Sequence, residues 1–324
     1  MTKDNKQKEL AIDARGLVKV FGDNRAVDGV DLQVPTGSIY GVLGPNGAGK
    51  TTTINMLATL LRPDSGTAKI FGHDVQEEPQ IVRQLIGVTG QYASVDEGLS
   101  ATENLIIFGR LLGLGRSEAR QKAVDLLEEF GLTDAAKRPI AKYSGGMRRR
   151  LDLAVSLIAQ PPLIFLDEPT TGLDPRTRAQ MWDTIRRLVA GGSTILLTTQ
   201  YLDEADQLAD RIAVIDHGHV VAEGTPNELK ASIGNAALNI TLKNEKDAAK
   251  ASVIIEKVLK TKVQSPNPKE LTSPMTNPDS ITDVLVELRK ADIRLDEFSV
   301  QKPTLDEVFL ALTGAHVKEG DKNE

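Results

Sequence analysis

The chain has 324 residues, 40% of them hydrophobic, which is enough for about two domains with sizeable cores. The formal net charge of −6 gives no support for a nucleic-acid partner, and the absence of cysteine excludes disulfides, thiolate zinc sites and cysteine nucleophiles. Residues 1–9 lack the apolar core of a signal peptide, and no stretch reaches the roughly 18 apolar residues of a membrane span. Any role at a membrane would therefore require a separate membrane partner.

The first part of the chain reads as strands followed by a glycine-rich loop and a helix. Residues 10–43 alternate apolar and polar side chains as short strands do, with turns at 22–24 and 35–37. The run 39–43 is apolar and leads into the glycine-rich residues 44–49. A helix-patterned segment follows, so we expect a strand, a loop and a helix in that order.

This glycine-rich loop matches the phosphate-binding P-loop. Its residues are Gly44, Pro45, Asn46, Gly47, Ala48, Gly49, Lys50, Thr51 and Thr52. Glycines let several backbone N–H groups point at one anion, and the N-terminus of the next helix adds partial positive charge. Lys50 can reach the outer phosphates, and the Thr51 hydroxyl can ligate magnesium. The full pattern in this context favours nucleoside triphosphate binding over a chance glycine turn.

Residues 92–160 are mostly helix-patterned and contain a second glycine-rich motif, Ser144-Gly145-Gly146, at a helix start. Such a motif is a potential phosphate cradle. A single chain does not need two cradles, but two copies paired head to tail could each supply half of each site. The run Arg148–Arg150 that follows is interpreted as a solvated helix face, with contact to a membrane partner as the alternative.

An acid pair follows an uninterrupted apolar run at residues 163–166, which predicts a strand buried on both faces of a parallel sheet. Asp167 and Glu168 lie at its carboxyl end, where open α/β sheets bind ligands. Asp167 would hold magnesium through water, and Glu168 would orient or polarise an attacking water. Paired acids are common on surfaces, but this context favours phosphate hydrolysis.

The remainder of the chain divides near residue 235. A second buried strand is predicted at 194–198, and a hairpin at 211–222. Strand patterns at 236–242 and 298–300 alternate with helix patterns at 253–259 and 281–288. This alternation within residues 236–316 indicates a small α+β domain with a ferredoxin-like arrangement.

The motifs together resemble those of ATP-binding-cassette (ABC) ATPases. The P-loop, Gln91, the motif at 144–146, the acid pair and Gly172-Leu173-Asp174 occur in the family's order. Within that family the chain resembles the ATP-binding subunits of daunorubicin/doxorubicin-type drug exporters. This resemblance is carried by residues 88–99, 143–152, 198–210 and 305–314 and therefore spans nearly the whole chain.

The resemblance implies an α/β fold: a P-loop NTPase (RecA-like) ABC ATPase core with an antiparallel β subdomain and a helical subdomain, plus a small C-terminal α+β domain. It places the nucleotide-binding domain at 10–232, with its helical subdomain at about 92–160, and the accessory domain at 236–316. Residues 1–9 and 317–324 are expected to be flexible tails.

The resemblance also implies roles for individual residues. Phe21 would stack on adenine, although a core position in a strand is the alternative. Gln91 would contact magnesium and the attacking water and sense the membrane subunit. The motif at residues 144–146 would hold the γ-phosphate of ATP bound to the other protomer.

Gln200 is the main departure, because it stands where the family usually has a histidine. A glutamine amide can donate a hydrogen bond to phosphate but cannot carry a proton or a charge. We therefore assign the water to Glu168 and a positioning role to Gln200, with Lys50 and Gln91 completing the catalytic set.

The sequence thus predicts an ATP- and Mg²⁺-dependent ATPase subunit of an anthracycline-like drug exporter. It would work as a homodimer with a membrane permease on a separate chain, at the cytoplasmic side of the membrane as a peripheral subunit, without nucleic acid. A soluble member of the same superfamily is one alternative, although this chain holds one cassette and no inserted coiled coil. A non-enzymatic ATP-binding regulator is the other, which Gln200 keeps open.

Overall fold

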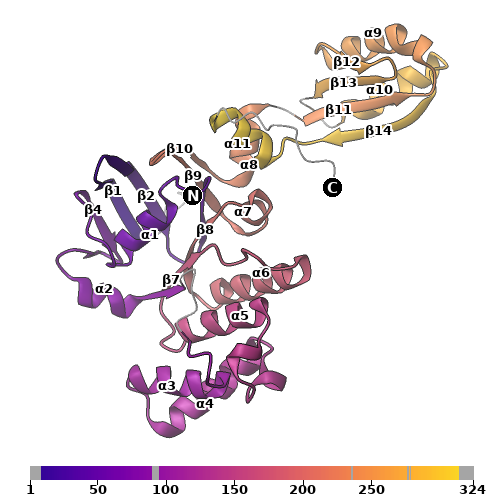
Figure 1. Cartoon of the computed structure of the whole chain (residues 1–324). Coiled ribbons are helices and arrows are strands. Elements are labelled where there is room, and N and C mark those ends of the chain that lie inside the picture. The colour runs from indigo at the N-terminus through magenta and orange to yellow at the C-terminus, as the bar shows by residue number, and fades with distance from the viewer. Residues whose placement is uncertain (1–8, 90–94, 235, 276, 278, 314–324) are drawn as a thin grey trace, which may run out of the picture. The chain divides into compact units, whose positions relative to one another are not determined.

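The computed structural model describes residues 9–89, 95–234, 236–275, 277 and 279–313. The chain forms two compact units, Met1–Thr225 and Pro226–Glu324 (Figure 1). This division assigns α8 (Pro226–Ile233) to the second unit. No helix in the described ranges combines the length and apolar character needed to span a membrane.

A six-stranded sheet in the order β10-β9-β3-β8-β7-β6 forms the centre of the first unit. Its strands are β3 (Ile39–Leu43), β6 (Ile86–Thr89), β7 (Leu163–Asp167), β8 (Thr194–Thr199), β9 (Arg211–Asp216) and β10 (His219–Gly224). All neighbours pair in parallel except β9 with β10, which form the expected hairpin. Every residue of β3, β7 and β8 is buried, as predicted for strands covered on both faces.

Side-chain alternation along the central strands divides the core of this unit in two. Leu163 and Phe165 of β7 face one cluster, and Ile164 and Leu166 face the other. The second cluster, which contains Ile164 and Leu166, is completed by the helical subdomain and by α6. These helices are α3 (Ala101–Leu111), α4 (Arg116–Glu129), η1 (Thr133–Ala135), η2 (Ile140–Lys142), α5 (Gly145–Ser156) and α6 (Pro175–Ala190).

The first cluster, which contains Leu163 and Phe165, is covered by α1 (Lys50–Leu57) and by an antiparallel sheet in the order β2-β1-β4-β5. These strands are β1 (Leu10–Phe21), β2 (Asn24–Pro35), β4 (Ser65–Ile70) and β5 (His73–Asp74). The sequence pattern predicted short strands in this region, with separate runs at 11–14 and 17–21, whereas β1 is one strand of 12 residues. Gly16, at a φ of 57°, sits at a register shift inside β1, and its N–H donates to the Asp31 carboxylate at 2.6 Å. A bulge therefore interrupts the alternation without ending the strand.

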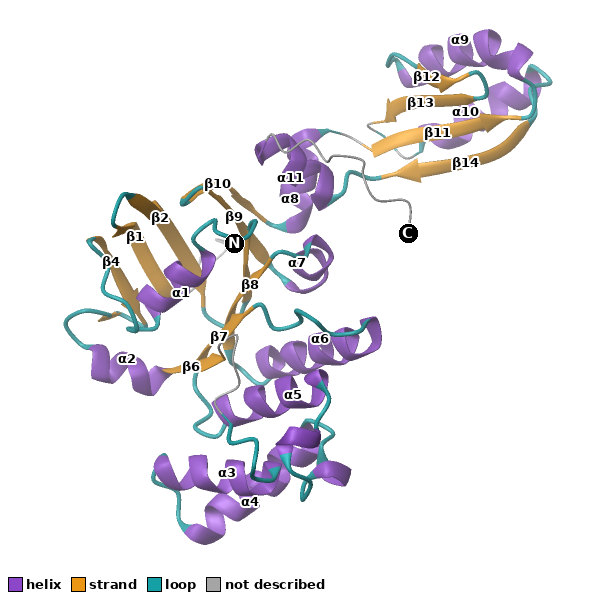
Figure 2. Cartoon of the chain, viewed as in Figure 1, coloured by secondary structure: helices purple, strands orange, loops and turns teal. Residues whose placement is uncertain are grey.

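Figure 2 separates the helices and strands of both units by colour. Two further helices of the first unit, α2 (Pro79–Leu85) and α7 (Leu202–Leu208), follow β5 and β8 in sequence. The antiparallel sheet, the helical subdomain and the parallel core agree with the fold class predicted from the sequence.

The second unit contains a four-stranded antiparallel sheet in the order β12-β13-β11-β14. Its elements after α8 are β11 (Ala236–Leu242), η3 (Glu245–Asp247), α9 (Ala248–Leu259), β12 (Gln264–Asn267), β13 (Glu270–Met275), α10 (Ser280–Lys290), β14 (Leu295–Gln301) and α11 (Leu305–Thr313). The β-α-β-β-α-β succession is ferredoxin-like and confirms the α+β prediction. Leu238, Ile240 and Leu242 of β11 pack with residues of α9 and α10 in one core. Helix α11 contacts α8 and buries Leu305 and Val308.

Candidate nucleotide site

Three parallel strands of the central sheet end at one edge. In their registers Leu43 of β3 lies beside Thr199 of β8, and Asp167 of β7 lies beside Thr198. The P-loop follows β3, Glu168 follows β7 and Gln200 follows β8, so the topology brings these three predicted segments to the same edge. This is the edge at which open α/β sheets bind ligands.

The backbone of the P-loop requires glycine at two points of close approach. A Cβ atom at Gly44 would lie 2.2 Å from the Ile215 carbonyl oxygen, and one at Gly49 would lie 2.4 Å from that of Ala26. Gly49 also has a φ of 105°. Helix α1 begins at the next residue, Lys50, so its N-terminal N–H groups are available to an anion in this loop.

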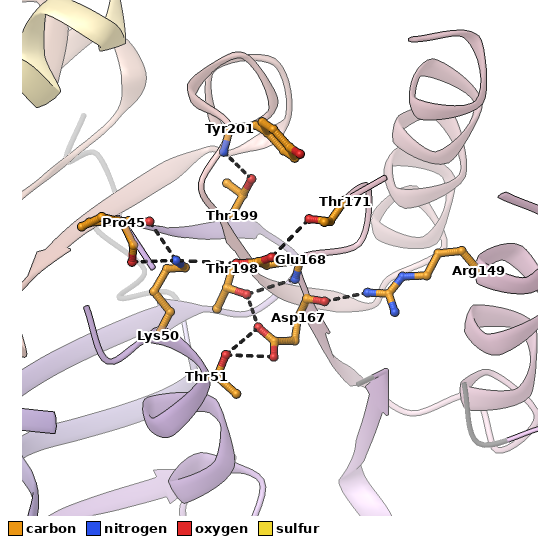
Figure 3. Close-up of polar contacts among 11 residues, drawn as sticks. Pro45, Lys50, Thr51, Arg149, Asp167, Glu168, Thr171, Thr198, Thr199 and Tyr201 are labelled. Carbon is orange, nitrogen blue, oxygen red and sulfur yellow. Dashed lines mark hydrogen bonds and ion pairs between the residues drawn. The ribbon is translucent and has the colours of Figure 1, made fainter. Parts of the chain in front are cut away.

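Lys50 is the buried cation of the site, with 4% of its surface exposed. Its Nζ donates to the carbonyl oxygens of Gly44 at 2.8 Å and Pro45 at 3.1 Å, and lies 3.7 Å from Glu168 Oε1 (Figure 3). Burial lowers the pKa of Lys50, and the nearby carboxylates of Glu168 and Asp167 partly offset this effect. The loop thus holds a desolvated ammonium at its inner side.

Asp167 is held by two hydroxyl groups from neighbouring elements. Thr51 Oγ1 donates to its Oδ2 at 3.0 Å and lies 3.2 Å from its Oδ1. Thr198 Oγ1 donates to Oδ1 at 2.5 Å. Hydroxyl and carboxylate oxygens are the ligands that Mg²⁺ prefers, so Thr51 and Asp167 form a donor set that fits this ion.

Glu168 has a left-handed backbone conformation, with a φ of 48°. Its N–H donates to the carbonyl oxygen and to the hydroxyl of Thr198, each at 3.1 Å. Its Oε2 accepts from the Thr171 hydroxyl at 3.2 Å. The two acids therefore occupy different environments, because Asp167 contacts hydroxyls and Glu168 approaches the Lys50 ammonium (Figure 3).

Arg149 shows that the interpretation of the arginine run as a solvated face is wrong for its central residue. Only 15% of its side chain is exposed. Its Nη2 donates to the Asp167 carbonyl oxygen at 2.6 Å (Figure 3). Its Nε donates to the carbonyl oxygen of Pro169 at 3.2 Å. Burial lowers the pKa of Arg149, and the carboxylate of Asp152 is the largest opposing influence. Arg149 therefore connects α5 to the backbone on both sides of Glu168.

Phe21 lies at the end of β1 and is 49% exposed, so it is not a core residue. The Lys19 ammonium lies 5.6 Å from the centre of its ring. The β1–β2 hairpin that carries Phe21 also carries Ala26, whose carbonyl approaches Gly49. The exposed ring and this approach both fit a face available for stacking.

The residues at 144–146 lie at the start of α5. Ser144 caps the helix and accepts a hydrogen bond from the Met147 N–H at 3.3 Å, and Gly145 is exposed. Among the described residues, no hydrogen bond joins this motif to the P-loop of the same chain.

Gln200 is half-buried between β8 and α7, whereas Gln91 lies outside the described residues. The neighbouring Tyr201 N–H donates to the Thr199 hydroxyl at 2.9 Å, which fixes the backbone after Gln200.

Glu204 is a buried acid that the sequence interpretation missed. It lies on α7 with no exposed surface, and its Oε1 accepts from Trp182 Nε1 at 3.2 Å. Burial raises the pKa of Glu204, and Thr199, Thr170 and Trp182 only partly offset this effect. The pattern around it, Asp203-Glu204-Ala205-Asp206, has the composition of an exposed helix, so only the fold reveals its burial.

The raised pKa of Glu204 predicts a specific pH dependence of stability. The folded state binds this proton more tightly than the unfolded state, so its contribution to the free energy of unfolding falls as pH rises from the ordinary pKa of 4.5 through the raised value. We expect Glu204→Gln to remove this contribution. Urea unfolding at several pH values should show that the variant gains stability relative to the parent as pH rises. A difference in stability that stays constant with pH would contradict the expectation.

Two family models match the chain. Residues 27–171 match the model described as "ABC transporter", and residues 224–313 match "ATP-binding protein DrrA1-3-like, C-terminal domain". The two matches together include the P-loop, the acid pair and nearly all of the second unit.

Curated relatives match along almost the whole chain. The daunorubicin/doxorubicin resistance ATP-binding protein DrrA of Streptomyces peucetius is 56% identical over 96% of this chain and 94% of its own length. The doxorubicin resistance ATP-binding protein DrrA of Mycobacterium tuberculosis (strain ATCC 25618 / H37Rv) is 46% identical over 94% of each chain. The Nod factor export ATP-binding protein I of Rhizobium sp. (strain N33) is 38% identical over 96% of this chain and 99% of its own.

Solved structures match the cassette. The ADP conformation of an ATP-binding cassette of an ABC transporter has a TM-score of 0.62 and 27% identity, covering 68% of this chain and 92% of that one. A dimeric post-hydrolysis cassette bound to ADP and phosphate shares the fold, with a TM-score of 0.61 over 66% of this chain and 98% of that one. A relative is 56% identical over nearly the full length of the chain, and the carboxyl edge of the central sheet brings the P-loop beside the acid pair. The chain therefore belongs to the ATP-binding proteins of ABC transporters and is an ATPase subunit that works with a separate membrane component.

Proposed function

We propose that the protein drives the export of daunorubicin- or doxorubicin-like drugs by a membrane permease on a separate chain. The observation that carries this proposal is that similarity to drug-resistance ATP-binding proteins continues through the second unit instead of ending with the cassette. The proposed place of the protein is the cytoplasmic side of the membrane, bound to the permease as a peripheral subunit.

In the proposed cycle, two copies bind ATP between them. The P-loop of one copy, residues 44–52, holds the phosphates, and Phe21 stacks on the adenine. Ser144, Gly145 and Gly146 of the other copy contact the γ-phosphate, for which their position at the start of α5 is suited. The exposed Ser144 and Gly145, and the absence of a hydrogen bond from this motif to the described P-loop of the same chain, support a role between copies.

Hydrolysis in this proposal is the attack of water on the γ-phosphorus. Glu168 orients and polarises the water, and Lys50 stabilises charge on the transferring group. Magnesium held by Thr51, Asp167 and, as the family resemblance implies, Gln91 would neutralise charge on the phosphate oxygens when bound. Gln200 positions the γ-phosphate by donating from its amide, which needs no titrating proton. The Thr51–Asp167 and Lys50–Glu168 contacts support this division of roles.

The export of Nod factor is a second candidate function, since proteins with that description are 38–42% identical to this chain. The greater identity of 56% to a drug-resistance protein favours the drug.

Transport into inside-out membrane vesicles tests the proposal. We expect vesicles that contain the protein and its permease to accumulate daunorubicin when ATP is added, and vesicles with Lys50→Ala in place of the parent to accumulate none. ATP hydrolysis without daunorubicin accumulation would contradict the drug assignment and leave the ATPase assignment standing. Accumulation of Nod factor in the same vesicles would support the second candidate.

A further inference from the structure

The C-terminal sheet has two very different edges. At one edge, β12 has four residues, includes Pro266, and is polar and exposed throughout. At the other edge, β14 has seven residues and pairs only with β11 among the described strands (Figure 2). Proline and short length are common means by which proteins block an edge strand from further pairing. β14 lacks both within its bounds, so its outward backbone N–H and C=O groups can accept another strand.

β14 also carries apolar side chains that its own domain does not cover. Phe298 is 50% exposed and Val300 is 38% exposed. Their register partners on β11 are Ile240 and Leu238, which are buried in the core beneath α9 and α10. Opposite residues of paired strands point to the same face of a sheet. The apolar face of the sheet therefore continues onto β14, where Phe298 and Val300 remain exposed.

The charges around β14 favour a second copy of the same strand in antiparallel orientation. Asp296 and Glu297 lie near its start, and Lys302 follows its end at Gln301. An antiparallel pair of β14 strands places the acidic start of each beside the basic end of the other. A parallel pair would place like charges side by side, which destabilises the pairing.

We propose that β14 is a self-association surface through which two copies of the protein join their C-terminal sheets. The two-fold axis passes at Ser299, so that Phe298 of one copy lies opposite Val300 of the other. In this register Glu297 lies opposite Gln301, and the two sheets form one continuous sheet of eight strands, four from each copy. Pro303 ends the pairing, since it has no N–H to donate.

This surface is distinct from the nucleotide site and does not rest on the proposed function. A pairing of about five residues buries less than the roughly 1,000 Å² of a stable independent interface. We therefore expect weak association that does not require ATP. Where a second contact already holds two copies together, it raises the effective concentration of one β14 strand near the other. The β14 pairing would then strengthen the association of the two copies.

Cysteine cross-linking tests the surface directly, because the chain contains no cysteine. Opposite residues in an antiparallel pair have Cα atoms about 4.5–5.5 Å apart, within the range that a disulfide can bridge. The full-length variant Ser299→Cys, oxidised without nucleotide, should form disulfide dimers about tenfold faster than Ser265→Cys. Ser265 is the matched control, since it is also an exposed serine in an edge strand, β12. Equal rates for the two variants would overturn the proposal.

Three further variants test the register and the apolar contact. In a mixture of Glu297→Cys and Gln301→Cys, disulfides should join the two different variants, because identical residues would lie about 13 Å apart. Adding Phe298→Lys to Ser299→Cys should reduce the cross-linking to the rate of the Ser265→Cys control. Circular dichroism should show unchanged folding, as expected for a half-exposed side chain.

Other outcomes would overturn the register or the partner. If Glu297→Cys cross-links with itself as fast as with Gln301→Cys, the register centred on Ser299 is wrong. If β14 is protected from hydrogen exchange only when the permease is added, and no disulfide forms between copies, the edge belongs to the permease and self-association is wrong. None of these results depends on ATP binding, so they leave the proposed function untouched.

Discussion

Replacing Glu168 by glutamine is expected to lower ATP turnover by about 10²–10⁴-fold, the range for loss of a general acid or base. Glutamine keeps the size of the side chain, and the backbone N–H still donates to Thr198. The amide cannot polarise the attacking water as a carboxylate does. ATP binding should persist, because the P-loop, Lys50 and Thr51 are unchanged.

Steady-state phosphate release and gel filtration with ATP and magnesium measure this effect. The variant should elute as a dimer, since bound ATP is no longer hydrolysed and the closed pair does not reopen. Glu128→Gln, an exposed residue of α4, is the matched control and should behave as the parent. An elution volume of monomer only, or turnover close to that of the parent, would show that Glu168 does not have the proposed role.

Replacing Lys50 by alanine should abolish measurable turnover and weaken ATP binding by about 10- to 150-fold, the effect of losing charged hydrogen bonds worth roughly 1.5–3 kcal/mol. The Nζ atom is the buried cation beside the loop carbonyls of Gly44 and Pro45 and the carboxylate of Glu168. Without it, the phosphates would meet Glu168 and Asp167 with one positive charge fewer.

Nucleotide titration by calorimetry, together with phosphate release, separates binding from turnover in this variant. Lys69→Ala removes an exposed lysine from β4 and serves as the control for a general loss of charge. If Lys50→Ala hydrolyses ATP at the parent rate, the assignment of the P-loop to catalysis is wrong. If it binds ATP as tightly as the parent but does not hydrolyse it, Lys50 acts only in the transition state.

The sequence predicted the parts of the site that depend on local backbone. The P-loop, the buried strand before Asp167 and the helix start at Ser144 each lie within one short segment, so composition and order are sufficient to find them. The C-terminal strand β11 and helices α9 and α10 were found for the same reason. Strand β12 was not, because Gln264-Ser265-Pro266-Asn267 has neither alternation nor β-branched residues and is defined only by pairing with β13.

Contacts between distant segments account for the other misses. Arg149 looks like a surface arginine until α5 packs beside the end of β7, which lies 18 residues further along the chain. Glu204 looks exposed until α7 packs near Trp182 of α6. In contrast, α6 was within reach of the sequence, because Asp174 caps it and Pro175 occupies its first turn.

The left-handed backbone of Glu168 has a consequence for how this enzyme balances stability against activity. A non-glycine residue in that region costs about 1–3 kcal/mol of folding free energy, and glycine would avoid most of it. The chain nevertheless places the carboxylate proposed to act on the attacking water there and restrains the segment from both sides, through Thr198 and through Arg149 on α5. A small displacement of α5 would weaken one of these restraints and let the backbone relax, turning the carboxylate away from Lys50. Turnover should therefore be more sensitive than folding to changes in the helical subdomain.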